Sequence, residues 1–259
     1  MKQRLINGDC LKEMPFLEER SIDLVLTDLP YGVTQNTADV CLPLDKLWLE
    51  WKCLLKPNGV VVLTSQFPFT IDLVNSNRDW FKYDLVWNKV LSSGFLNANK
   101  MPLRSHEQIL VFYKTQPQFH PQKTPGQKSH TVGHTPIKQN NNYGEHERVD
   151  NSEKHGCLKF PTSIITISKP HSSVALHPTE KPVELAEYLI KTYTAVGDTV
   201  LDCCMGVGWS GIAAKKLNRN FVGIELNQSY FDTARHRLDN VTVSLVPLLV
   251  PNKVSSEQK

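Results

Sequence analysis

The chain has 259 residues, of which 40% are hydrophobic and 21% charged, as in ordinary soluble globular proteins. Its formal net charge of +3 neither requires nor excludes a nucleic-acid partner, because a basic cleft can lie within a nearly neutral total. No apolar run reaches the roughly 18 residues of a membrane span, and the polar N-terminus lacks a leader pattern, so we expect a cytoplasmic protein. The six cysteines form no CxxC pair, so their spacing predicts neither a disulfide framework nor a metal site.

Strands and helices alternate along the first part of the chain. We expect a buried strand over residues 21–27, ending at Asp28, and a helix over residues 44–55. A turn then leads into a strand over residues 60–64, and two further strands are expected over residues 83–87 and 108–113. We assign residues 1–114 to the first half of one domain.

The composition changes between residues 115 and 159. This stretch is rich in Gln, Asn, His, Lys, Pro and Gly and poor in aliphatic residues, so we expect a loop-rich insertion. A long insertion of this kind within a compact domain serves binding or is simply a surface loop. Composition alone leaves both interpretations open.

Regular elements return after the insertion. The sequence predicts a helix over residues 184–193, a strand over 199–202, a helix over 210–217, a strand over 221–225 and a helix over 230–238. Strands that alternate with helices indicate an α/β fold with a doubly wound, mostly parallel sheet. We assign residues 160–245 to the second half of the domain and residues 246–259 to a frayed tail.

A glycine-bearing loop follows the strand over residues 199–202. Gly206 and Gly208 allow a tight turn at the start of the next helix, where backbone N–H groups can approach a ligand. Glu225 ends the following strand, where its carboxylate can accept hydrogen bonds from both hydroxyls of a ribose. The pattern predicts a nucleotide site; a purely structural strand–turn–helix is the alternative.

The acid before this loop bears on which nucleotide is bound. Asp202 would repel the pyrophosphate of NAD, whereas it would attract the cationic aminoacyl group of S-adenosylmethionine. Few residues follow Glu225, so the remaining strands of the sheet must come from the N-terminal half. We therefore expect the cofactor half at the C-terminal end of the domain, with S-adenosylmethionine as cofactor.

The tetrapeptide Asp28-Leu29-Pro30-Tyr31 follows the first buried strand. Pro30 holds Leu29 in an extended conformation, which leaves the Leu29 carbonyl free beside the Asp28 carboxylate. Two adjacent acceptors suit an amino group with two hydrogens, and Tyr31 offers a flat face on which a base can stack. The alternative is a turn with a capping aspartate and a core tyrosine.

These segments resemble the motifs of the β-class amino-methylating DNA methyltransferases. Asp28–Tyr31 is similar to their Asp-Pro-Pro-Tyr motif, and Asp202–Gly208 (Asp-Cys-Cys-Met-Gly-Val-Gly) to their Asp-Pro-Phe-Met-Gly-Ser-Gly cofactor motif. Further similar segments are Asn7–Leu11, which would line the adenosine pocket with Asp9 and Cys10, His177–Leu185, and Gly223–Leu226, which would form the ribose-binding strand. The catalytic motif precedes the cofactor motif, which is the permuted order of that class.

The resemblance implies a Rossmann-like methyltransferase that acts on a base flipped out of double-stranded DNA. It places Asp28, Leu29, Pro30 and Tyr31 at the catalytic centre. It assigns cofactor binding to Asp9, Cys10, Asp28, Lys181, Asp202, Cys204, Gly206, Gly208, Glu225 and Leu226. Residues 115–159, with basic residues at Lys123, Lys128, Lys138 and Arg148, would recognise the target sequence.

The sequence departs from the family pattern at several positions, namely Leu29, Cys203, Cys204, Val207 and Trp209. Asp rather than Ser at the first catalytic position favours adenine N6, with cytosine N4 as the alternative. Because of these departures, a catalytically weak DNA-binding relative is one alternative. The glycine loop is also compatible with an NAD-dependent enzyme, an alternative that Asp202 disfavours. The resemblance also implies a dimer in a bacterial or phage setting, and leaves a restriction partner open.

Overall fold

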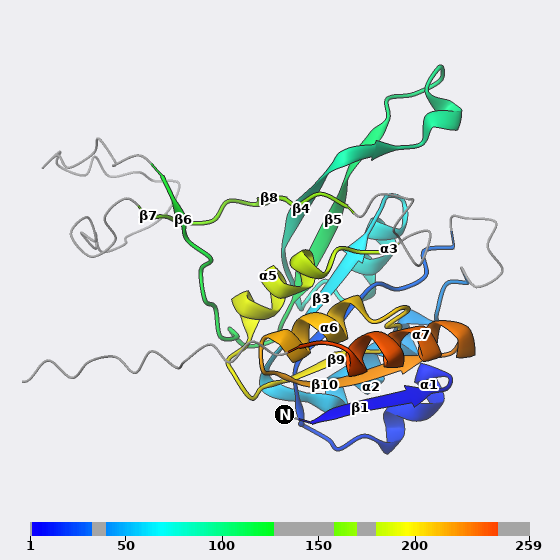
Figure 1. Cartoon of the computed structure of the whole chain (residues 1–259), viewed down its shortest axis with the longest axis vertical. Coiled ribbons are helices and arrows are strands. Elements are labelled where there is room, and N and C mark those ends of the chain that lie inside the picture. Colours follow the sequence, from blue (N-terminus) through cyan, green and yellow to red (C-terminus); the bar gives the residue numbers. More distant parts are fainter. Residues whose placement is uncertain (1, 33–39, 127–157, 170–179, 243–259) are drawn as a thin grey trace, which may run out of the picture.

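A computed structural model of the chain describes residues 2–32, 40–126, 158–169 and 180–242. An eight-stranded sheet forms its centre (Figure 1). Its strands are β1 (Gln3–Asn7), β2 (Ile22–Thr27), β3 (Leu55–Ser65), β4 (Phe81–Ser93), β5 (Arg104–Phe112), β8 (Ile164–Thr166), β9 (Thr199–Asp202) and β10 (Asn220–Glu225). Their spatial order is β1-β10-β9-β2-β3-β5-β4-β8.

Most neighbouring strands of this sheet run parallel, as the sequence predicts. Only β5 is antiparallel to its neighbours β3 and β4. The two halves of the chain meet where β2 pairs with β9, with Leu24 opposite Val200 and Val25 opposite Leu201. Both halves of the chain therefore contribute strands to one continuous sheet.

Helices cover both faces of the sheet (Figure 1). One layer holds α1 (Cys10–Glu13), η1 (Met14–Phe16), α2 (Leu44–Leu54) and α3 (Phe69–Ser76), and the other holds α5 (Val183–Tyr193), α6 (Trp209–Lys216) and α7 (Gln228–Asp239). In β2, Leu24 and Leu26 pack in the core cluster beneath α5–α7, whereas Val25 packs in the cluster beneath α1–α3. Burial on both faces explains why three consecutive residues of this strand, Leu24 to Leu26, are apolar.

Two segments project from this body (Figure 1). The β4–β5 hairpin carries the short helix η2 (Phe95–Asn97) near its tip. Elsewhere β6 (Thr124–Pro125) pairs antiparallel with β7 (Leu158–Lys159), with Thr124 opposite Lys159. Residues 127–157 therefore leave and re-enter the described structure at adjacent points.

All the predicted strands and helices are present, but several have other bounds. Strand β3 begins at Leu55 rather than Val60, because residues 55–59 continue the strand across a shift in its register with β2. Strand β4 spans Phe81–Ser93 rather than residues 83–87, and β5 begins at Arg104 rather than at residue 108. The pattern did not predict strands β1, β6, β7 and β8, helix α3 or the short helices α1, η1 and η2. In the part of the chain that the structure describes, no helix is long and apolar enough to cross a membrane.

Candidate active site

The carboxyl ends of the parallel strands gather the predicted site residues at one edge of the sheet. Asp28 follows β2, Asp202 ends β9, and Glu225 ends β10. Asp9 lies just beyond β1, which pairs with β10 so that Asn7 is opposite Glu225. Because ligands of open α/β sheets bind outside the carboxyl ends of the strands, the catalytic and cofactor motifs lie where a shared ligand site is expected.

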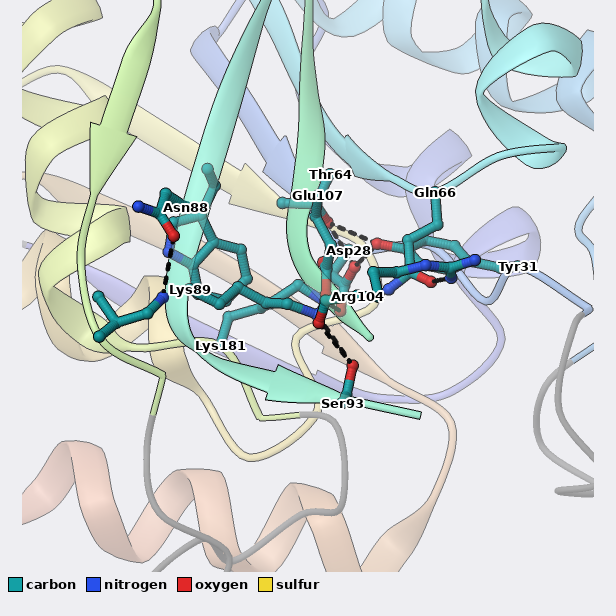
Figure 2. A network of polar contacts seen from close by, with 12 residues as sticks. Asp28, Tyr31, Thr64, Gln66, Asn88, Lys89, Ser93, Arg104, Glu107 and Lys181 are labelled. Carbon is teal, nitrogen blue, oxygen red and sulfur yellow. Dashed lines mark hydrogen bonds and ion pairs between the residues drawn. The ribbon is translucent and has the colours of Figure 1, made fainter. Parts of the chain in front are cut away.

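The Asp28 carboxylate lies in a shell of donors (Figure 2). Its Oδ1 accepts hydrogen bonds from the Tyr31 hydroxyl, at 2.7 Å, and from the Thr64 hydroxyl. Its Oδ2 accepts from Lys181 Nζ, also at 2.7 Å. A carboxylate offers about four acceptor positions, and the described side chains fill three of them. The side chain is 19% exposed, so it is not sealed from solvent, and one acceptor position on Oδ2 is not filled by a described side chain.

The rest of the tetrapeptide is fixed by packing. The Leu29 side chain is buried in the core cluster beneath α1–α3, so only the backbone of this residue can take part in chemistry. The Tyr31 ring packs against Phe69, with 5.4 Å between centroids. Burial, together with the neighbouring carboxylates of Asp28 and Glu107, raises the pKa of Tyr31, so its hydroxyl remains a donor to Asp28.

Lys181 connects Asp28 to a second buried carboxylate. Its Nζ lies 3.3 Å from Oε2 of Glu107, and Oε1 of Glu107 accepts a hydrogen bond from Lys89 Nζ at 3.0 Å (Figure 2). Burial alone would lower the pKa of Lys181, but Asp28 and Glu107 outweigh it and raise that pKa. Burial raises the pKa of Glu107, but Lys181 and Lys89 lower it by more, so that the pKa is lowered overall. The result is a row of alternating charges, Asp28–Lys181–Glu107–Lys89.

Three members of this network were not predicted from the sequence, namely Thr64, Lys89 and Glu107. The signal was present for Lys89 alone, which lies between apolar residues of β4, whereas Glu107 is flanked by the polar residues His106 and Gln108. Finding them required knowing that β4 and β5 pair next to β3, which the local pattern does not reveal. Lys181 was assigned to cofactor binding, and in the structure its Nζ contacts two carboxylates of this chain.

Asp202 organises the loop after β9 from inside the protein. Its side chain is fully buried and accepts hydrogen bonds from the Cys204 N–H, at 3.1 Å, and from the Ser210 hydroxyl. Burial raises the pKa of Asp202 to about 7 despite these hydrogen bonds. At Gly208, φ is 86°, and a β-carbon there would lie 2.9 Å from the Leu238 side chain, so any other residue at this position would be strained.

The raised pKa of Asp202 predicts a pH-dependent stability. The folded protein holds a proton on Asp202 up to about pH 7, whereas the unfolded chain releases it near pH 4. Raising the pH through this interval should therefore lower the free energy of unfolding of the wild type by a few kcal/mol more than that of Asp202→Asn. The expected size follows from about 1.4 kcal/mol per pKa unit. Urea unfolding of both proteins at about pH 5 and about pH 8 measures this difference. Parallel pH profiles would contradict the assignment.

Glu225 holds the cofactor loop together at its other end. Its Oε2 accepts a hydrogen bond from the Gly206 N–H at 2.9 Å, and its Oε1 from the Asn227 N–H at 2.8 Å. Next to it, Asp9 caps α1 by accepting a hydrogen bond from the Leu11 N–H. Leu226 is largely exposed at the strand end. Two carboxylates on adjacent strand ends, beside a glycine loop, fit a ligand that presents ribose hydroxyls.

Three cysteines meet beside these carboxylates. The sulfur atoms of Cys10, Cys203 and Cys204 all lie within 4.8 Å of one another. The Cys203 thiol also contacts the Thr27 hydroxyl at 3.7 Å. Hydrogen bonds from the other two thiols lower the pKa of Cys10. Cys10 and Cys204 were predicted to be cofactor-lining residues, but the sequence spacing gave no sign that Cys203 joins them.

The chain is similar to known DNA methyltransferases in sequence and in fold. Residues 22–236 match the family N6_N4_Mtase, described as DNA methylase. The chain is 30% identical over 254 residues to the type II methyltransferase M.HpaI of Haemophilus parainfluenzae, covering 93% of this chain and 75% of that protein. Its fold is similar to that of the M1.HpyAVI–SAM complex, with a TM-score of 0.61, 24% identity and coverage of 91% and 100%. It is also similar to the PvuII DNA methyltransferase (cytosine-N4-specific), with a TM-score of 0.65, 18% identity and coverage of 94% and 89%.

Proposed function

Because the chain belongs to the N6- and N4-specific DNA methylase family, we propose that it methylates N6 of adenine at a specific site in double-stranded DNA. The protein is a DNA methyltransferase and uses S-adenosylmethionine as its methyl donor. The observation that supports adenine is Asp28 at the first catalytic position, where a serine is the pattern for cytosine N4. The similarity to the cytosine-N4-specific PvuII enzyme keeps N4 as the alternative.

In the proposed mechanism Asp28 acts as an acceptor for the target amino group. The lone pair of an exocyclic amine is delocalised into the ring, so the amine is a weak nucleophile. Acceptors that hold both of its hydrogens, Asp28 Oδ2 and the Leu29 carbonyl, favour a pyramidal nitrogen whose lone pair is available. Tyr31, Thr64 and Lys181 hold the carboxylate in place before the base arrives, so little reorganisation remains for the reaction itself.

The cofactor supplies an electrophilic sulfonium methyl group when bound. We propose that Glu225 and Asp9 receive its ribose hydroxyls, with Leu226, Cys10 and Cys204 beside the adenine. The turn through Gly206 and Gly208 would face the aminoacyl part, held in shape by Asp202. Lys181, at the Asp28 carboxylate, would lie where the cofactor half meets the catalytic half.

Removing the Glu225 carboxylate should weaken cofactor binding. We expect Glu225→Ala to lower the affinity for S-adenosylmethionine by about 1.5–3 kcal/mol, the range for hydrogen bonds to a charged group. Calorimetric titration measures this loss, and Glu225→Gln is the matched control because it keeps the side-chain volume and one acceptor oxygen. Unchanged affinity in a folded Glu225→Ala protein would remove this residue from the site.

We also propose that the segment over residues 115–159 recognises the target sequence. Its part over residues 127–157 can be exchanged cleanly, because β6 and β7 hold its two ends side by side. Replacing residues 127–157 by a short Gly/Ser linker should abolish site-selective methylation and leave cofactor affinity nearly unchanged. Sequencing of the methylated positions is the measurement. Retained sequence preference would place recognition elsewhere in the chain.

The choice of base has a direct test. DNA methylated by the purified protein is digested to nucleosides, and the modified nucleoside is identified by mass and by comparison with standards. We expect N6-methyldeoxyadenosine. N4-methyldeoxycytidine would overturn the proposal in favour of the alternative, and no modified nucleoside from a protein that binds S-adenosylmethionine would indicate a weak DNA-binding relative.

A further inference from the structure

The thiols of Cys10, Cys203 and Cys204 have no chemical role in the proposed methyl transfer. Cys10 follows β1, and Cys203 and Cys204 follow β9, with β10 between these two strands in the sheet. Cys10 and Cys203 are buried, whereas Cys204 is partly exposed. The three thiols are soft metal ligands held at the ends of neighbouring elements. A metal ion could enter from the side of Cys204, which is the partly exposed member.

The spacing of the sulfur atoms suits a single ion. Thiolates bound to one Zn²⁺ at about 2.3 Å are roughly 3.8–4.0 Å apart. The three sulfur atoms already lie within 4.8 Å of one another, so small side-chain rotations would bring them into contact with an ion. Three thiolates leave a fourth tetrahedral position open, and sulfur ligands select soft cations over Mg²⁺ or Ca²⁺.

The surroundings are also consistent with a metal site. The Thr27 hydroxyl, 3.7 Å from Cys203 Sγ, can turn its hydrogen toward a thiolate once that sulfur is deprotonated. The backbone N–H of Cys204 is tied to Asp202, which fixes the turn that carries two of the ligands. Binding of the ion displaces the thiol protons, so no oxidant or other reactant is required.

We propose that Cys10, Cys203 and Cys204 bind one thiophilic metal ion, Zn²⁺ or the softer Cd²⁺, and that this ion excludes the cofactor. The exclusion rests on the proposed function, in which Cys10, Cys204 and Glu225 line the adenosine pocket. Glu225 ends β10, the strand between those that carry the three cysteines. An ion at the three sulfurs therefore occupies the wall that would contact the adenine.

Cadmium titration tests the metal site directly, because Cd²⁺ bound to thiolates has a strong charge-transfer absorption in the ultraviolet. The reference protein carries Cys41→Ser, Cys53→Ser and Cys157→Ser, so that only the three cluster thiols remain. We expect the reference protein to bind one equivalent of Cd²⁺, with the same affinity as the strongest Cd²⁺ site of the wild type. Adding Cys204→Ser, at the partly exposed position, should weaken this binding by at least about tenfold. Mutating a residue that only hydrogen-bonds to a metal ligand already costs about tenfold in metal affinity, and Cys204 would be a ligand itself.

The outcomes separate the two parts of the proposal. The metal site is overturned if the reference protein shows no charge-transfer absorption, or if adding Cys10→Ser or Cys204→Ser leaves its affinity for Cd²⁺ unchanged. Circular dichroism verifies that each variant is folded. Calorimetry then compares S-adenosylmethionine binding by metal-free and Cd²⁺-loaded reference protein, and equal affinities would overturn the exclusion. Failure of the metal-free wild type to bind S-adenosylmethionine would instead count against the proposed function, while the absorption still decides the metal site.

Discussion

Asp28→Ala should lower the single-turnover rate of methyl transfer by about 10²–10³-fold, the cost of removing one preorganised group from a reacting centre. The substitution removes the only side chain that the proposed mechanism offers to the amino hydrogens. Binding of DNA and of S-adenosylmethionine should change much less, since neither depends mainly on this carboxylate. Single-turnover assays with both ligands saturating separate the chemical step from binding.

Two further variants make this result specific. Asp28→Asn keeps the volume of the side chain but presents an amide, so we expect a large loss of rate as well. Tyr31→Phe removes one of the hydrogen bonds to Asp28 Oδ1 and leaves the carboxylate present, so we expect a smaller loss. A folded Asp28→Ala protein with the wild-type rate would eliminate Asp28 as the catalytic acceptor.

Lys181→Met should destabilise the fold by about 3–5 kcal/mol, the range for breaking a buried ion pair by removing one partner. Lys181 is 5% exposed, and its two carboxylate partners, Asp28 and Glu107, are 19% and 7% exposed. Glu107 keeps Lys89 as a partner, whereas Asp28 loses its only described cation. Chemical denaturation followed by circular dichroism gives the free energy of unfolding.

A double variant tests the cause of this loss. Lys181→Met combined with Asp28→Asn removes both charges of the pair, so it should be more stable than Lys181→Met alone. Lys56→Met is the surface control: Lys56 also binds an aspartate, Asp23, at 2.7 Å, but is 37% exposed. We expect a cost of at most about 1 kcal/mol there, because solvent screens the pair. Equal costs for Lys181→Met and Lys56→Met would show that burial of the network contributes nothing.

Much of the fold followed from the sequence because the sheet is buried on both faces. Buried strands such as residues 21–27, alternating with helices, indicated a doubly wound sheet without any knowledge of strand order. The acids at strand ends were predictable for the same reason, since a carboxylate directly after a buried run must lie at the edge of the sheet. Asp28, Asp202 and Glu225 all lie at that edge in the structure.

Thr64 and Glu107 were not predictable as members of the site, because they come from strands that do not neighbour the predicted motifs in the sequence. Thr64 reaches Asp28 from β3, and Glu107 reaches Lys181 from β5, which inserts between β3 and β4 as an antiparallel strand. Local periodicity carries no information on such pairings. The cysteine cluster was missed for the same reason: Cys10 is distant from Cys203 and Cys204 along the chain, and the folded sheet brings them together.

The pairing of β6 with β7 separates residues 127–157 from the main sheet. Residues 127–157 are inserted through a neck of two short strands, so their length and sequence can vary without moving any strand of the main sheet. The acids and lysines around Asp28 have no such freedom, because each contacts several others across the core. If the segment beyond the neck does read DNA, new target sequences can arise by exchange of that segment while the methyl-transfer chemistry is inherited unchanged.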